Sequence, residues 1–290
     1  MSPAEENVPP KVAAFFDVDN TVIRGASAFH IARGLWRRDY FTFRDIIKFG
    51  YEQSSYLMFG ESQEQMDRLR EHGLGIIEGW SVAEMTSVGE EVYDELLETR
   101  VYPGTKDIID EHISKGHEVW LVTASPIEIG RMLARRIGAT GALGTVAEHV
   151  NGFYTGRLDG DFLHGPRKGE RVRALAAERG IDLEASHAYG DSLNDRTMLE
   201  TVGYPCAINP DPKMRKLARE RGWPIREFRK RSKSGRRGVL KSSVTGAAWV
   251  TIQVARGVKS AVRGLIRGLF RWPRRAPSPG TGNPEAAREL

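Results

Sequence analysis

The stretch from Phe15 to Thr21 constrains the fold of this chain most, because it places two carboxylates, separated by one residue, directly after an apolar run. The run, residues 12–16, has the length and composition of a buried strand. Side chains at positions i and i+2 of a strand share one face. Asp17 and Asp19 are therefore expected to point the same way from the carboxyl end of a strand, where open α/β sheets bind their ligands.

Two carboxylates this close repel each other unless a cation lies between them or one of them is protonated. Both arrangements suit an active site, since one carboxylate can attack as a nucleophile while the protonated one donates to the leaving group, and Mg²⁺ can offset the charge. The alternative is a strand end followed by an Asp-Asn turn or a helix cap. This motif alone does not decide between the two.

Two further segments carry polar residues after a predicted strand or at a predicted helix start. Thr123 follows the apolar residues 119–122, and it and the amides behind it are candidates for holding a phosphoryl oxygen, against an ordinary Ser-Pro helix start at Pro126. Lys168 begins a helical pattern that ends at Gly180. A cation there opposes the helix dipole, so the side chain is expected either to serve a site or to be a solvated surface lysine.

A third segment, residues 190–195, follows the strand-like residues 186–189 and is rich in oxygen ligands for a divalent metal. Asp191 is the candidate metal ligand, and Asn194 and Asp195 are candidates for positioning the metal or a phosphate. Helix capping is the alternative for this segment. Capping does not account for carboxylates that converge at several strand ends.

Together these segments resemble the haloacid dehalogenase (HAD) superfamily of phosphatases, most closely subfamily IB, the branch that contains phosphoserine phosphatases. The resemblance covers roughly residues 11–225 and rests on four motifs in order: Asp17-x-Asp19-x-Thr21, Thr123, Lys168, and Gly190-Asp191-x-x-Asn194-Asp195.

The resemblance implies a mechanism, a cofactor and, through its phosphoserine phosphatase branch, a role in L-serine biosynthesis. Asp17 is expected to attack phosphorus and form an aspartyl-phosphate, and Asp19 to protonate the leaving alcohol and then activate water. The expected ligands of Mg²⁺ are Asp17, the backbone carbonyl of Asp19, and Asp191. The expected phosphate-binding residues are Thr123, Lys168 and Asn194, with Thr21 and Asp195 in support.

The rest of the chain alternates strand and helix patterns, which predicts an α/β fold: a Rossmann-like parallel sheet with helices on both faces. The predicted strands are residues 12–16, 117–122, 186–189 and 204–208, and the predicted helices are residues 104–115, 126–138, 168–180 and 211–222. Asn151-Gly152, between residues 146–150 and 153–158, predicts a β-hairpin beside this sheet.

The predicted organisation has four parts: a disordered leader (1–10), a HAD-like core (11–24 and 101–225), an inserted helical cap (25–100) and a basic tail (226–290). In the resembled family the cap closes over the substrate and selects the leaving group. Phosphoserine phosphatases carry a glutamate for the substrate ammonium at the position that is Ala26 here, so the resemblance to that substrate weakens at this point. The alternatives are another small organic phosphate or a lysophospholipid phosphate, and, from another class, a non-catalytic scaffold at a membrane.

The tail differs in charge from the rest of the chain. Residues 226–290 hold 16 Lys and Arg against three Asp and Glu, whereas residues 1–225 hold 27 against 35. Residues 244–271 are predicted to form an amphipathic basic helix with an apolar stretch too short to span a bilayer, which favours binding to an anionic membrane surface. The alternatives are an acidic protein partner or the acidic core of this chain, and nonspecific contact with nucleic acid, which is least favoured.

The cysteine content and the amino-terminal sequence indicate in which cellular compartment the protein is expected. Cys206 is the single cysteine, which excludes an internal disulfide, and residues 1–10 contain no apolar signal-peptide core. A cytoplasmic protein is expected, with peripheral attachment to the inner face of the membrane through the tail. The oligomeric state does not follow from these patterns.

Overall fold

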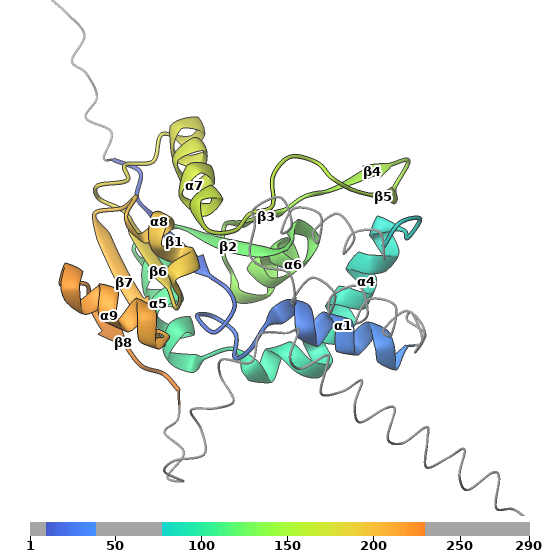
Figure 1. Cartoon of the computed structure of the whole chain (residues 1–290), viewed down its shortest axis with the longest axis horizontal. Coiled ribbons are helices and arrows are strands. Elements are labelled where there is room, and N and C mark those ends of the chain that lie inside the picture. Colours follow the sequence, from blue (N-terminus) through green and yellow to red (C-terminus); the bar gives the residue numbers. More distant parts are fainter. Residues whose placement is uncertain (1–9, 39–76, 230–290) are drawn as a thin grey trace, which may run out of the picture. The chain divides into compact units, whose positions relative to one another are not determined.

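The computed structural model describes residues 10–38 and 77–229 of the chain (Figure 1). Its strands are β1 (Ala13–Asp17), β2 (Glu118–Pro126), β3 (Gly141–Thr145), β4 (Ala147–Val150), β5 (Phe153–Leu158), β6 (His187–Gly190), β7 (Tyr204–Ile208) and β8 (Ile225–Arg226). Its α-helices are α1 (Ser27–Arg37), α4 (Val82–Val92), α5 (Pro103–Ser114), α6 (Ile127–Ile137), α7 (Pro166–Arg179), α8 (Arg196–Leu199) and α9 (Pro212–Arg221). Shorter helical turns are η1 (Tyr93–Leu97), η2 (Glu98–Arg100) and η3 (Leu193–Asp195).

Six parallel strands form one sheet in the order β3-β2-β1-β6-β7-β8. In the centre, Asp17 of β1 pairs with Val122 of β2, and Phe16 pairs with Tyr189 of β6. The chain runs from β1 outward to β2 and β3 and then crosses to β6 on the other side, so the strand order reverses at β1. Ligands of open α/β sheets bind at the carboxyl ends of the strands at such a reversal, which is where Asp17 ends β1.

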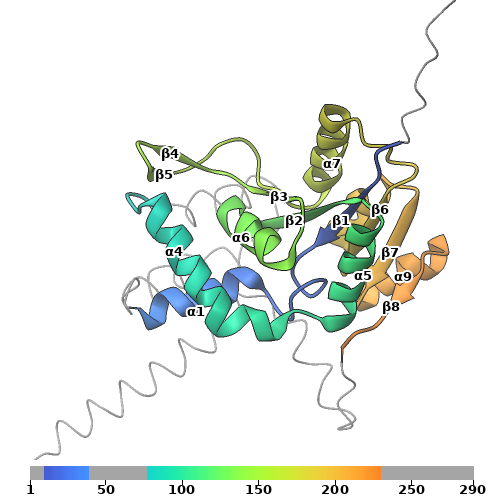
Figure 2. The ribbon, with the colours of Figure 1, turned by 180° about the vertical axis from the view of Figure 1, so that it is seen from behind.

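The side chains of β1 alternate between two cores, one on each face of the sheet. Ala14 and Phe16 join the core that contains residues of α5 and α6, while Ala13 and Phe15 join the core that contains residues of α7, α8 and α9. A parallel strand covered on both faces needs such a continuous apolar run. Figures 1 and 2 show α7 and α5 on opposite sides of the sheet. The predicted α/β fold with helices on both faces is confirmed.

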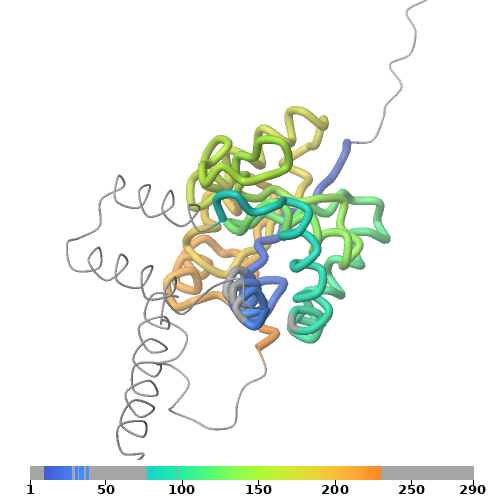
Figure 3. The backbone as a smooth tube through the Cα atoms, turned by 90° about the vertical axis from the view of Figure 1, so that its right-hand side faces the viewer, coloured from blue at the N-terminus to red at the C-terminus, as the bar shows by residue number. Residues whose placement is uncertain are grey.

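The helices α1 (blue in Figure 3) and α4 (teal) contact each other, and α4 also contacts α6. Arg38, just after α1, makes ion pairs with Glu91 of α4 and Glu95 of η1, at 2.9 and 2.8 Å. Glu90 of α4 pairs with Arg136 of α6 at 2.8 Å, and apolar side chains of α1 and α4 share a core with α6. These helices belong to the predicted cap, whose residues 39–76 lie outside the described residues.

The predicted hairpin is confirmed as β4 and β5, an antiparallel pair joined by Asn151 and Gly152. Both turn residues have positive φ angles, 53° and 81°, which is the conformation that Asn-Gly adopts readily. Tyr154 of β5 exchanges backbone hydrogen bonds with the segment before α4: its amide donates to the Trp80 carbonyl at 2.9 Å, and its carbonyl accepts from the Gly79 amide at 2.8 Å. The hairpin is therefore tied to a segment of the predicted cap.

The structure extends the predicted sheet at both edges. β3 contains two glycines and β8 has two residues, so neither gives the apolar run by which the other strands are recognised. β2 continues to Pro126 instead of ending at residue 122, because its last residue pairs with Thr145 of β3. Pro126 thus precedes α6 as its N-cap and is not its first residue.

The folded part of the chain reaches past the predicted start of the tail at residue 226. β8 crosses that boundary, and the backbone amide of Phe228 donates to the Asn209 side chain at 2.7 Å. The rest of the tail, with the predicted helix at 244–271, and residues 1–9 of the leader lie outside the described residues. Of the helices in the described part of the chain, none is long and apolar enough to cross a membrane.

Candidate active site

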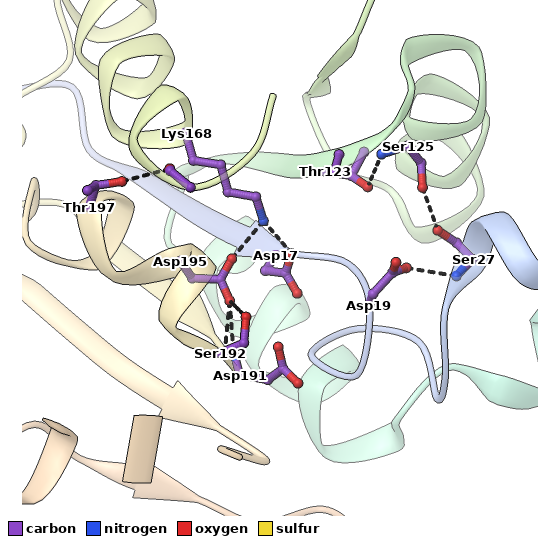
Figure 4. A network of polar contacts seen from close by, with 12 residues as sticks. Asp17, Asp19, Ser27, Thr123, Ser125, Lys168, Asp191, Ser192, Asp195 and Thr197 are labelled. Carbon is purple, nitrogen blue, oxygen red and sulfur yellow. Dashed lines mark hydrogen bonds and ion pairs between the residues drawn. The ribbon is translucent and has the colours of Figure 1, made fainter. Parts of the chain in front are cut away.

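Asp17 and Lys168 form a buried ion pair at the carboxyl end of β1. α7 begins at Pro166, whose fixed φ and missing N–H suit the first turn of a helix, and Lys168 follows in that turn. The Lys168 Nζ atom lies 2.6 Å from Asp17 Oδ1, and the two residues are 3% and 6% exposed (Figure 4). The alternative of a solvated surface lysine is wrong, because the carboxylates around Nζ outweigh the unfavourable helix dipole.

Asp195 is the second carboxylate that holds Lys168. Its Oδ1 atom accepts from Lys168 Nζ at 2.7 Å, and its Oδ2 atom accepts from the backbone amides of Asp191 and Ser192 at 3.1 and 3.2 Å. With Ser192 it also forms a capping box on η3. Both of its oxygens are occupied by protein donors, so Asp195 orients the lysine and the loop after β6.

Two glycines allow these elements to approach closely. A Cβ atom at Gly190 would lie 2.5 Å from Asp195 Cβ, and one at Gly169 would lie 2.7 Å from the Thr197 carbonyl oxygen. The first glycine lets the Asp195 side chain fold under the end of β6. The second lets α7, and with it Lys168, sit against α8.

Asp191 is placed differently from Asp195. It lies one residue beyond β6, and its carboxylate has no hydrogen-bond or ion-pair partner within residues 10–38 and 77–229. One carboxylate oxygen from each of Asp17, Asp191 and Asp195 lies within 4.8 Å of the other two. Asp191 is thus the acid with both oxygens available to a ligand.

The charges at this site do not balance within the described residues. Burial raises the pKa of Asp17 to about 7, helped by the charge of Asp195 and opposed by that of Lys168. Burial, followed by the charges of Asp17 and Asp195, raises the pKa of Asp191 to about 9. Burial lowers the pKa of Lys168, but Asp17 and Asp195 raise it more, so the ammonium stays charged. With all three acids ionised, one ammonium leaves excess negative charge, and the raised pKa values express its cost. A bound cation would offset that charge, and these oxygen donors fit a hard divalent cation such as Mg²⁺.

Asp19 lies on the other side of Asp17, toward α1 (Figure 4). Its Oδ1 atom accepts from the backbone amide of Ser27, the first residue of α1, at 2.8 Å. The Ser27 hydroxyl in turn lies 2.9 Å from the Ser125 hydroxyl at the end of β2. Burial raises the pKa of Asp19, with the Ser27 hydrogen bonds opposing. A held carboxyl group with a raised pKa is suited to giving up and taking back a proton.

The remaining predicted residues fall into two groups. Thr123 is buried one residue beyond Val122, the partner of Asp17, and its Oγ1 accepts from the Ser125 amide at 3.1 Å, which leaves its own proton available to a ligand. Thr21 is fully buried, and its Oγ1 has no hydrogen-bond partner among the described residues. Asn194 is exposed on η3, and the structure does not bring its side chain into a hydrogen bond with the acids.

Three residues contribute to the site without having been predicted from the sequence: Ser27, Ser125 and Asn209. The Asn209 side chain is fully buried after β7, donates to the Asn20 carbonyl at 3.0 Å and accepts from the Phe228 amide. It therefore fixes the loop behind Asp19. A polar residue directly after an apolar strand is the signal that marked Asp17 and Thr123, and the same signal was present at Asn209.

Comparisons with known proteins agree with this geometry. The family model for haloacid dehalogenase-like hydrolases matches residues 14–200. The phosphoserine phosphatase SerB1 of Mycobacterium tuberculosis is 49% identical over 237 residues, which cover 81% of this chain and 77% of that protein.

Two solved structures share the fold. One is a protein of unknown function from Bordetella pertussis, with a TM-score of 0.68 and 28% identity over 76% of this chain and 100% of that one. The other is a phosphoserine phosphatase solved as a phospho-aspartyl intermediate analogue, with a TM-score of 0.51 over 77% of this chain and 96% of that one. Its 19% identity to this chain supports a shared fold alone. By the family model and the extent of these matches, the chain belongs to the haloacid dehalogenase-like hydrolases.

Proposed function

We propose that this chain is a Mg²⁺-dependent phosphomonoesterase in which Asp17 is the nucleophile and Asp19 the acid and base. The observation that supports it most is the buried meeting of Asp17, Lys168 and Asp191 at the central strand ends, with Asp19 held apart by α1. A structural core does not need an unbalanced cluster of acids, whereas transfer of a dianionic phosphoryl group does need positive charge and a nucleophile there.

In the first step a carboxylate oxygen of Asp17 attacks phosphorus, and the bond from phosphorus to the leaving oxygen breaks. The carboxyl proton of Asp19 passes to that oxygen, so an alcohol leaves and Asp17 becomes an aspartyl-phosphate. Lys168, 2.6 Å from Asp17, stabilises the charge that moves onto the phosphoryl oxygens. The Thr123 hydroxyl is the neutral donor proposed for those oxygens, with Thr21 in support.

In the second step water attacks the same phosphorus atom. Asp19, now a carboxylate, accepts a proton from that water, the bond between phosphorus and the Asp17 oxygen breaks, and inorganic phosphate leaves. Asp19 regains its proton and Asp17 its free carboxylate, so both residues are ready for another cycle. The hydrogen bond from the Ser27 amide keeps Asp19 in one position through both steps.

Asp17 and Asp191 are the residues proposed to hold Mg²⁺, together with the backbone carbonyl of Asp19. When bound, Mg²⁺ would neutralise part of the carboxylate charge and polarise the phosphoryl group. Asn194 is proposed as a phosphate contact on the strength of the motif.

Phosphoserine is the first substrate to test, because of the 49% identical relative that bears that name. Hydrolysis of phosphoserine would place the chain in serine formation. Against this, Ala26 is exposed and supplies no carboxylate for an ammonium group. Another organic phosphate or a lysophospholipid phosphate is the second candidate, because the basic tail favours an anionic lipid surface.

The proposed function is tested by phosphate release in Mg²⁺ across phosphoserine, sugar phosphates and lysophosphatidate, with Asp17→Asn as the blank. A preference for phosphoserine supports the first substrate and implies that another residue meets its ammonium. A preference for a different phosphate rejects phosphoserine. If the wild type releases phosphate from none of these substrates, the proposal that the chain is a phosphomonoesterase is contradicted. A non-catalytic scaffold is then favoured.

The lipid part of the proposal has its own test. A chain ending at Arg229 keeps the contacts of β8 and Phe228 and lacks residues 230–290 of the basic tail. It is expected to turn over a small soluble substrate at the wild-type rate and to lose sedimentation with vesicles containing phosphatidylserine. Sedimentation of the shortened chain equal to that of the full chain rejects membrane binding through the tail.

A further inference from the structure

Three histidines meet at the amino end of the sheet, at the opposite end of the strands from the acids. His112 is in the last turn of α5, His117 is the residue before β2, and His187 is the first residue of β6. β1 lies between β2 and β6, with Ala13 paired to Glu118 and Ala14 paired to His187. The short turn after α5, with Gly116 at a φ of 76°, thus brings two histidines against the start of β6.

The ring nitrogens of the three histidines converge. One nitrogen from each lies within 4.8 Å of the other two, and the Nδ1 atoms of His112 and His117 are 2.9 Å apart. Zinc–nitrogen bonds of about 2.0–2.1 Å in a tetrahedral site put the nitrogens roughly 3.3 Å apart. The His112 and His117 nitrogens are therefore within a few tenths of an ångström of the separation that one ion needs, and the His187 nitrogen lies within 4.8 Å of both.

The surroundings of His112 suit a metal ligand. Its other nitrogen, Nε2, lies 2.8 Å from the hydroxyl of Tyr189, a residue on β6. If Nε2–H donates to that hydroxyl oxygen, Nδ1 carries a lone pair and faces His117. Histidine ligands generally donate their second N–H to such an acceptor, which fixes the tautomer and the ring.

The three rings are available as neutral ligands. Burial, followed by the charges of the other two histidines, lowers the pKa of His112 to about 4. Burial also lowers the pKa of His117 and of His187. The charge of Lys115 acts on all three histidines, and its pairing with Glu111 at 2.5 Å offsets its repulsion of a metal ion. Nitrogen ligands of this kind favour zinc, cobalt, nickel and copper over magnesium.

A cavity of about 960 Å³ adjoins the cluster and includes His112, His187 and Tyr189 in its lining. Three protein ligands with access to such a cavity leave a fourth position for water or a small ligand, as in open zinc sites. A fully packed histidine cluster would not offer that position.

We propose that His112, His117 and His187 bind one divalent transition-metal ion, of the zinc or cobalt type, at a site separate from the acids. Ala14 and Asp17 are three residues apart on β1, so the two sites are separated by about 10 Å along the strand. The acids offer oxygen and the histidines offer nitrogen, so each site selects a different class of ion.

The test is a Co²⁺ titration of tag-free, chelator-treated full-length protein in excess Mg²⁺, which fills the oxygen site. Nitrogen ligation in four-coordinate geometry gives a visible absorption band more intense than that of octahedral oxygen ligation. One equivalent of Co²⁺ is expected to produce this band, and Zn²⁺ to abolish it. Asp191→Asn, which alters the oxygen site, is expected to leave the band unchanged.

The variants assign the ligands. His117→Ala and His187→Ala, at partly exposed positions, are each expected to weaken Co²⁺ binding at least tenfold, and Tyr189→Phe to weaken it by roughly tenfold. His149→Ala, on the exposed hairpin, is the matched control and should bind like the wild type. Circular dichroism confirms that each variant is folded.

Two results overturn the proposal. One is the absence of an intense band in the folded wild type, in which case the histidines form a hydrogen-bonded cluster without a metal. The other is a band that survives in folded His117→Ala and His187→Ala or disappears in Asp191→Asn. None of these readouts depends on phosphatase activity.

Discussion

The Lys168 ammonium donates to the Asp17 carboxylate across 2.6 Å, with both side chains buried where α7 meets the end of β1. The two residues are 151 positions apart in the chain. Their contact joins the proposed nucleophile to the cation that balances it, so it links the stability of the fold to the chemistry of the site.

Lys168→Met should destabilise the protein by about 3 kcal/mol, because it leaves Asp17 and Asp195 buried without their cation. The measurement is urea unfolding at pH 7. Lys216→Met is the control, because Lys216 is 79% exposed and its pair with Glu220 spans 3.8 Å. Equal unfolding midpoints for the two variants would show that the buried pair does not stabilise the fold.

Ser27→Pro should impair catalysis by removing the amide that holds Asp19, while keeping a residue that the first position of a helix accepts. Turnover of an alkyl phosphate is expected to fall about tenfold or more, and that of p-nitrophenyl phosphate less, because a good leaving group needs little protonation. Ser27→Ala keeps the amide and removes only the hydroxyl, so it should lose less turnover of the alkyl phosphate than Ser27→Pro. A uniform loss on both substrates in folded Ser27→Pro would argue against an acid role for Asp19.

Gly190→Ala should lower turnover because its Cβ would lie 2.5 Å from Asp195 Cβ and displace the side chain that orients Lys168. A loss of at least tenfold in kcat is expected, since small displacements of catalytic groups are costly. Gly89→Ala in α4 is the control, because its Cβ would meet the flexible end of Ile129 at 3.1 Å. If both variants keep the wild-type kcat, the close approach at Gly190 is not needed to orient Lys168 for catalysis.

Glu118 should make stability depend on pH. Hydrogen bonds from Arg179, Lys11 and Trp120 lower its pKa from 4.5 to about 2, with burial opposing. The stabilisation is fully present above pH 4.5 and is lost as the pH falls toward 2, because the unfolded chain takes up this proton first.

Glu118→Gln should therefore cost about 2–3 kcal/mol at pH 7 and markedly less at pH 3, as measured by urea unfolding. Glu220→Gln, at an exposed position, should change little at either pH. A cost for Glu118→Gln that stays constant between the two pH values would contradict the lowered pKa.

The sequence was sufficient for the central sheet because β1 and β7 are mostly apolar runs that end at or just before a polar residue. β6 is short and less apolar, but the acidic segment from Asp191 follows it directly. It was insufficient for β3 and β8, which are held by pairing with neighbours and have little apolar character of their own.

In the site, too, some features were predicted from the sequence and others depend on contacts between distant parts of the chain. Asp17, Lys168 and Asp195 were predicted from motifs, and the structure joins them in one network. The role of Asp195 in holding Lys168, instead of facing a ligand, depends on the close approach at Gly190, which no local pattern reports. Ser27 was missed for a similar reason, since its 2.8 Å contact with Asp19 is made by a backbone amide, which no pattern of side-chain types reports.

The covalent step tests the central claim most directly. Wild-type protein is mixed with its best substrate in Mg²⁺, quenched in acid within one turnover, digested and examined by mass spectrometry. The account predicts one phosphoryl group on the peptide that contains Asp17, and neither that group nor turnover in folded Asp17→Asn. Wild-type turnover in Asp17→Asn, or a phosphoryl group on a different residue, would contradict it.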